Sequence, residues 1–504
     1  MSSLGYSGPR SEDQEPEGAQ SAWHRAQSVG SGWAGIVPSC VSPSSPRPFL
    51  RLRTADPQPP APTGSRARVL RALGPAASAP CPAPDLIDRA FSRFRSGDVV
   101  HLRKLKNELN VLELWYGVTY AFKDLSLSCA AQFLQYFLEK KGKHVTIVVG
   151  TSGDTGSAAI ESVQGAKNVD IIVLLPKGHC TKIQELQMTT VLKENVHVFG
   201  VEGNSDELDE PIKAMFTDVA FVKKHNLMSL NSINWCRVLV QIAHHFFAYF
   251  QCSPSLDMHP LPFVEMVVPT GAGGNLAAGC LAQKMGLPVR LVAAVNHNDI
   301  IHRAIQRGDF SLSAAVRPSL ASAMDIQVPY NMERIFWLFS GSNSQVTRAL
   351  MEQFERTQSL HLPKDLHSKL SEAMTSVSVS DEAITQAMGR CWEENQYLLC
   401  PHSAVAVSYH YQQMDGRQPS APQCCLASAS AVKFPEVVLA AGLTPKIPEE
   451  ILALERKETR CTLMKRGDDW TRMLRATIED LSRKRKRGPR RGPRKQHGKA
   501  PPAI

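Results

Sequence analysis

Short apolar runs alternate with segments of helical periodicity through the middle of the chain. Buried strands are predicted over residues 144–150, 169–176, 264–270 and 289–296, each an almost continuous apolar run. Helices are predicted over residues 85–94, 155–166, 181–192 and 274–286. Strands and helices alternate in this order in parallel βαβ units. The pattern therefore predicts an α/β fold with mostly parallel sheets and helices on both faces.

The two ends of the chain differ from this middle region in composition. Residues 1–84 contain 14 of the 34 prolines, and we expect this segment to be disordered because it buries too little apolar surface. The folded core is expected over residues 85–481, mostly helical after residue 308 apart from a small-residue strand at 424–430. Residues 482–504 are expected to form a basic, disordered tail.

The net charge of +10 is concentrated in that tail. Ten basic residues and no acidic ones lie between Arg483 and Lys499, so the rest of the chain is close to neutral. The run RKRKRGPRRGPRK (483–495) is a candidate for weak, salt-sensitive contact with nucleic acid and for a nuclear signal. We treat the run as an appendage, because no folded nucleic-acid module accompanies it in the sequence.

Several classes of protein do not fit this sequence. No apolar run approaches the roughly 20 residues that span a bilayer. The N-terminus lacks a basic start followed by an apolar run, so we expect no secretory signal. The 12 cysteines are scattered and form no paired CxxC sets, so we expect no metal site and reduced thiols in a cytoplasmic protein.

One candidate for chemistry is Lys123, in the segment AFKD (121–124) at the start of a long predicted helix. Placement near a helix N-terminus helps to lower the pKa of a lysine, which a nucleophilic amine needs. The alternative is a solvated helix lysine that pairs with Asp124.

Two Gly-rich turns between strand and helix are candidate anion sites. In GTSGDTGSAA (150–159), backbone N–H groups and the hydroxyls of Thr151, Ser152 and Thr155 can reach an anion such as a carboxylate. In PTGAGGN (269–275), glycines allow a phosphate to approach the backbone at a helix N-terminus. The alternative at the first turn is a tight connection that needs glycine for its backbone geometry alone. The second turn is neither a Walker A loop, because no Gly-Lys-Ser/Thr follows, nor a GxGxxG fingerprint.

Two further segments carry polar groups at the ends of predicted elements. In NSINWCRVLVQ (231–241), Asn231, Asn234 and Arg237 could together hold a phosphate, or the asparagines could cap the helix. The strand in CCLASASAVKFPE (424–436) ends in hydroxyls, and Ser428 could bond a heterocycle nitrogen or be a polar strand end.

Together and in this order, AFKD, SGDTGS, NSINWCR, PTGAGGN and the strand ending in KFPE resemble the threonine synthase family, whose fold is pyridoxal-phosphate (PLP) fold-type II. The match extends from about Asp85 to about Leu481. The resemblance implies two interleaved α/β domains, pyridoxal 5′-phosphate as cofactor, and phosphorylated hydroxy amino acids as substrates. It leaves the oligomeric state open.

The resemblance also assigns roles to residues. Lys123 would hold the cofactor as a Schiff base and later act as base on the substrate α-carbon. The family pattern assigns the cofactor to Asp154 (near the 3′ oxygen), to the phosphate loop Gly271, Ala272, Gly273, Gly274 and Asn275, and to Ser428 (the pyridine nitrogen). It assigns the substrate to Ser152 and Thr155 (the carboxylate), and to Asn231, Asn234 and Arg237 (the phosphate).

The sequence departs from the family pattern in several places. The loop GAGGN stands where threonine synthases commonly have GNFGN, and Ser430 and Ala431 stand where relatives often have His and Pro. Residues 1–84 do not resemble the folded segment with which the family begins. These changes favour a phospho-lyase that gives 2-oxobutanoate, ammonia and phosphate from O-phosphohomoserine or O-phosphothreonine. The alternative is a catalytically impaired relative that acts as a signalling or interaction protein.

Overall fold

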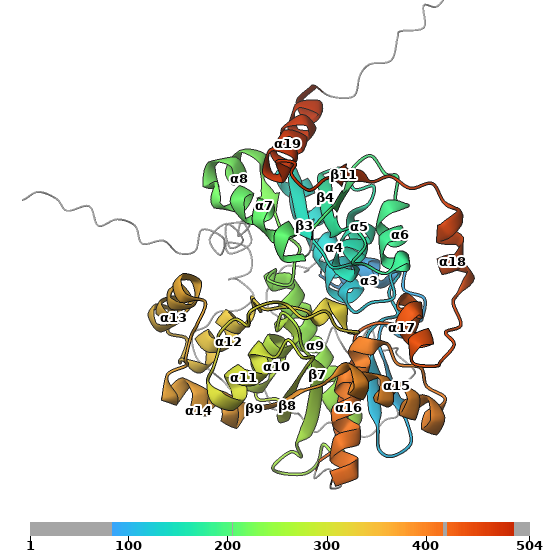
Figure 1. The fold of residues 1–504 in the computed structure, drawn as a ribbon, viewed down its shortest axis with the longest axis vertical. Helices are drawn as coiled ribbons and strands as arrows, with labels where there is room; N and C mark the ends of the chain where they lie inside the picture. Colours follow the sequence, from blue (N-terminus) through green and yellow to red (C-terminus); the bar gives the residue numbers. More distant parts are fainter. Residues whose placement is uncertain (1–82, 204, 417–420, 488–504) are drawn as a thin grey trace, which may run out of the picture.

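Two mostly parallel sheets with helices on both faces form the part of the chain that the computed structural model describes, residues 83–203, 205–416 and 421–487 (Figure 1). The α/β fold predicted from the apolar pattern is therefore confirmed. The expectations for residues 1–82 and 488–504 lie outside the described residues. The first helix, α3 (Ala83–Phe91), begins slightly before the predicted boundary of the core.

The larger sheet has six strands in the order β1-β2-β10-β7-β8-β9. Their bounds are β1 (His101–Lys104), β2 (Asn110–Glu113), β10 (Gln423–Ala427), β7 (Val264–Pro269), β8 (Val289–Val295) and β9 (Met374–Ser378). β1 and β2 pair antiparallel, and the other neighbours pair parallel. β10 lies between β2 and β7, which are far from it in the sequence.

Helices cover both faces of this sheet. Their bounds are α9 (Trp235–Cys252), α10 (Gly274–Lys284), α11 (Ile300–Arg307), α12 (Met332–Phe339), α13 (Ser344–Thr357), α14 (Lys364–Ala373), α15 (Asp381–Asn395), α16 (Pro401–Gly416) and α17 (Pro435–Ala440). Apolar residues of α9 to α12 fill the core on one face, and those of α15 and α16 fill it on the other. β7 and β8 are buried on both sides, which explains why their sequences are apolar runs without alternation.

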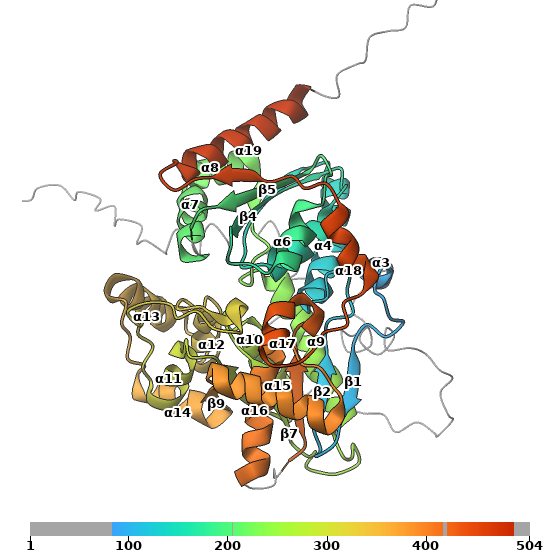
Figure 2. The ribbon, with the colours of Figure 1, turned by 45° about the vertical axis from the view of Figure 1, so that its right-hand side comes forward.

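The smaller sheet has five parallel strands in the order β11-β5-β4-β3-β6. Its strands are β11 (Thr462–Met464), β5 (Val196–Val201), β4 (Val169–Pro176), β3 (Val145–Gly150) and β6 (Leu227–Met228). The surrounding helices are α4 (Lys123–Lys141), α5 (Asp154–Val163), α6 (Lys182–Thr189), α7 (Ser205–Thr217), α8 (Val219–His225), α18 (Glu449–Leu452) and α19 (Trp470–Arg487). Figure 2 shows the two sheets in separate halves of the molecule, with α4 and α9, which pack against each other, near their junction.

The strands and helices predicted in the middle of the chain are present at nearly the predicted positions. β3, β4, β7 and β8 each end within one residue of the predicted bounds. The sequence did not predict the edge strands β1, β9, β11 and β6, or the interior strands β2 and β5. Among the described residues, none of the helices has both the length and the apolar character needed to cross a bilayer.

The C-terminal helix α19 continues to Arg487, past the boundary at residue 481 where the sequence predicted a disordered tail. Arg485 explains the difference, because its Nη1 lies 2.6 Å from Oδ2 of Asp170 on β4 and also donates to the Thr146 hydroxyl on β3. The beginning of the basic run is therefore part of the fold, where it fastens α19 to the smaller sheet.

We expect Arg485→Met to lower the free energy of unfolding by about 1–2 kcal/mol, because a charged hydrogen bond to a half-buried carboxylate is lost. Thermal unfolding of the full chain measures the change. Arg483→Met is the matched control, since Arg483 and its partner Asp480 have side chains 63% and 61% exposed and such pairs contribute little. Equal, small losses in both variants would show that Arg485 does not fasten the helix.

Candidate functional site

Lys123 is positioned by a chain segment that joins the two sheets. The residues before it lie against the end of β10: the N–H of Phe122 donates to the Ser428 carbonyl (2.8 Å), and the N–H of Ser430 donates to the Tyr120 carbonyl (3.0 Å). α4 then begins at Lys123 and packs onto the smaller sheet. Lys123 therefore lies at the junction of the sheets, beside the carboxyl end of β10.

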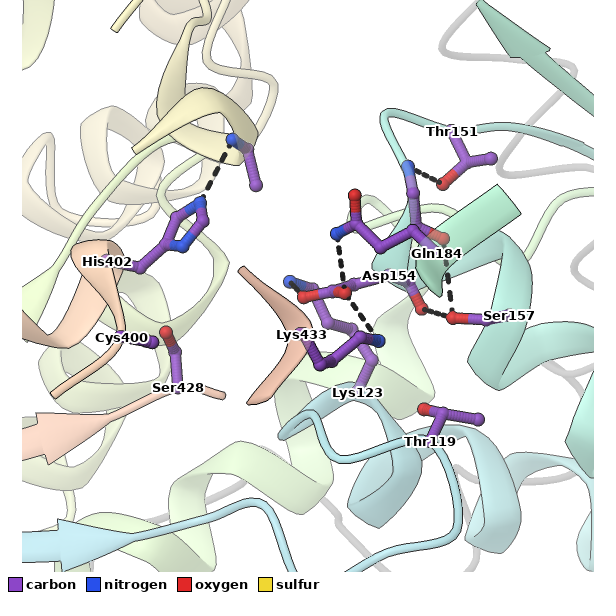
Figure 3. Close-up of polar contacts among 12 residues, drawn as sticks. Thr119, Lys123, Thr151, Asp154, Ser157, Gln184, Cys400, His402, Ser428 and Lys433 are labelled. Carbon is purple, nitrogen blue, oxygen red and sulfur yellow. Dashed lines mark hydrogen bonds and ion pairs between the residues drawn. The ribbon is translucent and has the colours of Figure 1, made fainter. Parts of the chain in front are cut away.

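Two lysines converge on one buried carboxylate at this junction (Figure 3). Nζ of Lys123 lies 3.1 Å from Oδ2 of Asp154, and Nζ of Lys433 lies 2.7 Å from Oδ1. Nε2 of Gln184 donates to the same Oδ1 at 2.8 Å. The three charged side chains are 12%, 2% and 0% exposed for Lys123, Asp154 and Lys433. The site therefore holds two cations and one anion away from water.

Burial and neighbouring charges oppose one another at Lys123. Burial lowers the pKa of the Lys123 amine, and it outweighs Asp154, which raises that pKa. Burial alone would raise the pKa of Asp154, but Lys433 and Lys123 outweigh it and hold that pKa well below its usual range. The arrangement therefore keeps Asp154 ionised and makes the Lys123 ammonium easier to deprotonate than a solvated one, as a nucleophilic amine requires.

The alternative pairing of Lys123 with Asp124 does not occur. The Asp124 carboxylate accepts hydrogen bonds from the Thr119 backbone N–H (2.8 Å) and hydroxyl (2.7 Å). Asp124 thus fastens the turn that leads into α4, and Lys123 is a buried side chain rather than a solvated one.

The Gly-rich turn after β3 places Asp154 at the start of α5. The hydroxyl of Thr151 accepts hydrogen bonds from the backbone N–H of Gly153 (3.0 Å) and of Gly156 (2.9 Å), which closes the turn. Gly153 has φ of 135°, a conformation that favours glycine. Ser152 and Thr155 flank Asp154 and are partly exposed, so their hydroxyls remain candidates for a ligand carboxylate.

The second Gly-rich turn ends β7 and begins α10, as the sequence predicted. Gly273 has φ of 76°, and no side chain of the described residues caps the helix, so the first N–H groups of α10 are available to an anion. The turn is held from outside, because Nδ2 of Asn331 donates to the Ala272 carbonyl (3.0 Å) and His245 lies 2.9 Å from Oδ1 of Asn275. Gly271 to Asn275 thus form a braced loop.

The asparagines of the NSIN segment are mostly structural. Asn234 caps α9: its Oδ1 accepts from the Cys236 N–H (3.0 Å), and its Nδ2 donates to the Ser229 carbonyl (3.0 Å). Both amide atoms therefore have a protein partner, although Nδ2 retains a second N–H, and a role of Asn234 in holding a phosphate stays a prediction. Nδ2 of Asn231 donates to the Gly150 carbonyl at 3.0 Å, and its buried Oδ1 has no partner among the described residues.

Arg237 is a buried cation without a counter-ion in the described part of the chain. Its Nη1 donates to the Leu230 carbonyl (3.2 Å), and its Nε lacks a partner there. Burial lowers the pKa of the guanidinium to about 10. Its charge also lowers the pKa of Lys123, so the two groups are close enough to interact. A buried, uncompensated cation of this kind favours an anionic ligand.

Ser428 lies at the end of β10, and its backbone is fixed on both sides. Its N–H donates to the Ser403 hydroxyl (3.2 Å), and its carbonyl accepts from Phe122. The side chain is partly exposed, with its hydroxyl on the side of the site across from Lys123 and Asp154 in Figure 3. The structure therefore brings Ser428 to the same site as Lys123.

Sequence reasoning missed three side chains of this site. Lys433 was present only as part of the motif KFPE, with no role assigned. Gln184 belongs to a capping box with Thr181, a pattern that the sequence displays as T-x-x-Q. No local sequence motif indicated His402, which lies at the start of α16.

The chain matches two protein-family models. Residues 98–428 match the model described as pyridoxal-phosphate dependent enzyme. Residues 403–477 match the model described as threonine synthase, C-terminal.

Individual relatives agree with these matches. The human protein "Threonine synthase-like 2" is 84% identical over 399 residues, which cover 79% of this chain and 82% of that protein. Threonine synthase from Pseudomonas aeruginosa is 36% identical over 400 residues, covering 79% and 84%. The PLP-bound threonine synthase from Brucella melitensis has a similar structure, with a TM-score of 0.72 and 31% identity over 80% of this chain and 84% of that one.

Proposed function

Because the chain belongs to the threonine synthase family of pyridoxal-phosphate-dependent enzymes, we propose that it is a phospho-lyase acting on phosphorylated hydroxy amino acids. The substrates we propose are water and either O-phosphohomoserine or O-phosphothreonine, and the products are 2-oxobutanoate, ammonia and phosphate. The observation that carries the proposal is the buried pair of Lys123 and Asp154 beside the uncompensated Arg237.

The residues present fit pyridoxal phosphate. Lys123 supplies a buried amine whose pKa is lowered, as covalent attachment to an aldehyde requires. The loop from Gly271 to Asn275 offers backbone N–H groups at the N-terminus of α10 to the cofactor phosphate. The Ser428 hydroxyl would meet the ring nitrogen, and Asp154 would lie near the ring oxygen. The cofactor supplies an electron sink for the negative charge that develops at the substrate α-carbon.

Side chains around the cofactor site would transfer the proton, stabilise charge and bind the substrate. Lys123 would take the α-proton of the substrate at its Nζ, which its lowered pKa permits. Lys433 keeps Asp154 ionised while Lys123 changes its protonation state. Arg237 places a positive charge where the leaving phosphate gains negative charge. The hydroxyls of Ser152 and Thr155 hold the substrate carboxylate at the start of α5.

The proposal is tested on the purified full chain. A visible absorption band that borohydride removes would report covalent cofactor, and phosphate release from O-phosphohomoserine and O-phosphothreonine would report the reaction. Accumulation of 2-oxobutanoate and ammonia is the expected outcome. Threonine as the main product would show a synthase, and a chain that binds PLP but releases no phosphate from either substrate would contradict the lyase.

We expect Gly271→Ala to weaken PLP binding by at least about 10-fold, because the phosphate loop has no room for a methyl group. A Cβ there would meet the Met324 Cα at 3.0 Å and the Ala323 carbonyl oxygen at 3.3 Å, both backbone atoms. Titration of the apoprotein with PLP measures the affinity. Gly389→Ala is the control, since its Cβ would enter open space on α15 and should leave the affinity unchanged.

A further inference from the structure

His402 is a buried histidine at the start of α16, and the reaction described above does not use it. Its ring packs against Phe434, with 4.8 Å between ring centroids. Its Nε2 accepts a hydrogen bond from the backbone N–H of Ala323 at 3.1 Å. Ala323 belongs to the short turn that touches the phosphate loop at Gly271. One nitrogen of His402 therefore braces that loop from outside.

The hydrogen bond to Nε2 determines which nitrogen of the neutral His402 ring carries the proton. A nitrogen that accepts from a backbone N–H cannot carry a proton itself, so a neutral ring must carry its proton on Nδ1. The ring is neutral, because burial, with Lys123 adding to it, lowers the pKa of His402 to about 3. His402 thus presents an Nδ1–H donor.

This donor has no partner among the described residues, although it is fully buried. A buried N–H without an acceptor costs free energy, so such groups are rare unless a ligand satisfies them. Figure 3 shows the ring on the same side of the view as Ser428, with Lys123 and Asp154 on the other side. The charges of Lys123, Asp154 and Lys433 all influence the ring, which places it within electrostatic reach of the cluster.

We propose that His402 is a ligand-contacting residue whose Nδ1–H donates a hydrogen bond to an anionic oxygen of the bound substrate or cofactor. This inference rests on the proposed function, since it takes the ligand to be PLP with a phosphorylated amino acid. The positive groups already at the site, Lys123, Lys433 and Arg237, favour an oxygen that carries negative charge. The Nδ1–H of a neutral imidazole orients this oxygen through a directional hydrogen bond and adds no further buried charge.

A purely structural role, in which His402 only braces Ala323 through Nε2, is the competing explanation. Two substitutions separate the two roles, because each places a polar atom at the position of only one of the two ring nitrogens. The amide of His402→Asn lies where Nδ1 lies and can still donate to a ligand, but it does not reach Ala323. The amide of His402→Gln reaches the position of Nε2 and can still accept from Ala323, but it leaves no donor at Nδ1.

Both variants and the wild-type full chain are compared in PLP affinity, measured by absorbance, and in kcat and KM for phosphate release. We expect His402→Gln to lose about 10- to 100-fold in one of these affinities, as the loss of a hydrogen bond to a charged group does, and His402→Asn to lose much less. A loss in PLP affinity assigns the oxygen to the cofactor, and a rise in KM at unchanged PLP affinity assigns it to the substrate.

The opposite order, with His402→Gln like wild type and His402→Asn impaired, would show that the ring is only a brace. Thermal unfolding of the holoenzymes tells whether either variant has lost its fold, and His402→Phe, which keeps the packing on Phe434 but has no polar atom, then provides the second comparison. In that case His402→Phe with wild-type affinities overturns the inference. A wild-type chain that releases no phosphate contradicts the proposed function instead, and PLP affinity alone then decides the role of His402.

Discussion

Lys123→Ala is expected to abolish the reducible absorption band and to reduce phosphate release by about 1,000-fold or more. Lys123 is the buried first residue of α4, at the junction of the two sheets, and the variant removes its amine. It also removes the group that takes the α-proton, so attachment and turnover fail together. Absorption spectra before and after borohydride, and phosphate release at saturating PLP, measure the two effects.

Lys433 provides a comparison for this prediction, because it is a second lysine whose amine contacts the Asp154 carboxylate. Lys433 is 0% exposed and lies 2.7 Å from Asp154, and it is not at the start of α4. Lys433→Met should therefore keep a reducible band, although weakened, and the borohydride-fixed adduct should map to the peptide that contains Lys123. An adduct on Lys433 in the wild-type chain would overturn the assignment of Lys123.

Asp154→Asn is expected to lower the free energy of unfolding of the apoprotein by about 3–5 kcal/mol, because it leaves two buried ammonium groups without a counter-ion. Lys123 and Lys433 both depend on this carboxylate, and Gln184 donates to it as well. Denaturant unfolding of the full chain measures the loss. The exposed ion pair of Asp480 and Arg483 provides the control, since Asp480→Asn should cost less than about 1 kcal/mol.

The double variant Asp154→Asn with Lys433→Met separates the electrostatic cause from a loss of packing. If uncompensated charge is the cause, removing one of the two cations should restore part of the stability that Asp154→Asn loses. If the double variant is less stable than either single variant by the sum of their losses, the two sites act independently and the charge argument is wrong.

The strands predicted correctly are buried ones, although the similarly buried strand β5 was not predicted. β3, β4, β7 and β8 are covered by helices on both faces, so each is a continuous apolar run. β9 and β11 are edge strands with exposed positions, MTSVS and TLM, so neither forms an apolar run. The extent of α19 was missed because its sequence has the composition of a tail, and a contact with Asp170, distant in sequence, makes it part of the fold.

The residues of the candidate site that could be predicted lie in local motifs. Lys123, the turn around Asp154 and the loop at Gly271 to Asn275 each stand at a boundary between strand and helix, where ligands of α/β proteins bind. Lys433, Gln184 and His402 reach the site only through tertiary packing, so spacing along the chain could not indicate them. Asn234 caps α9, which is one of the two interpretations that the sequence of this motif left open.

The position of β10 has a consequence for how the protein can be made. A ribosome releases β2 and β7 long before β10, the strand that must lie between them, and it releases β11 and α19 last of all. Until β10 arrives, β2 and β7 each present unpaired backbone groups along one edge, a state that invites aggregation. Neither sheet can therefore be completed during most of translation, and the nascent chain depends on protection of these edges until synthesis is nearly finished.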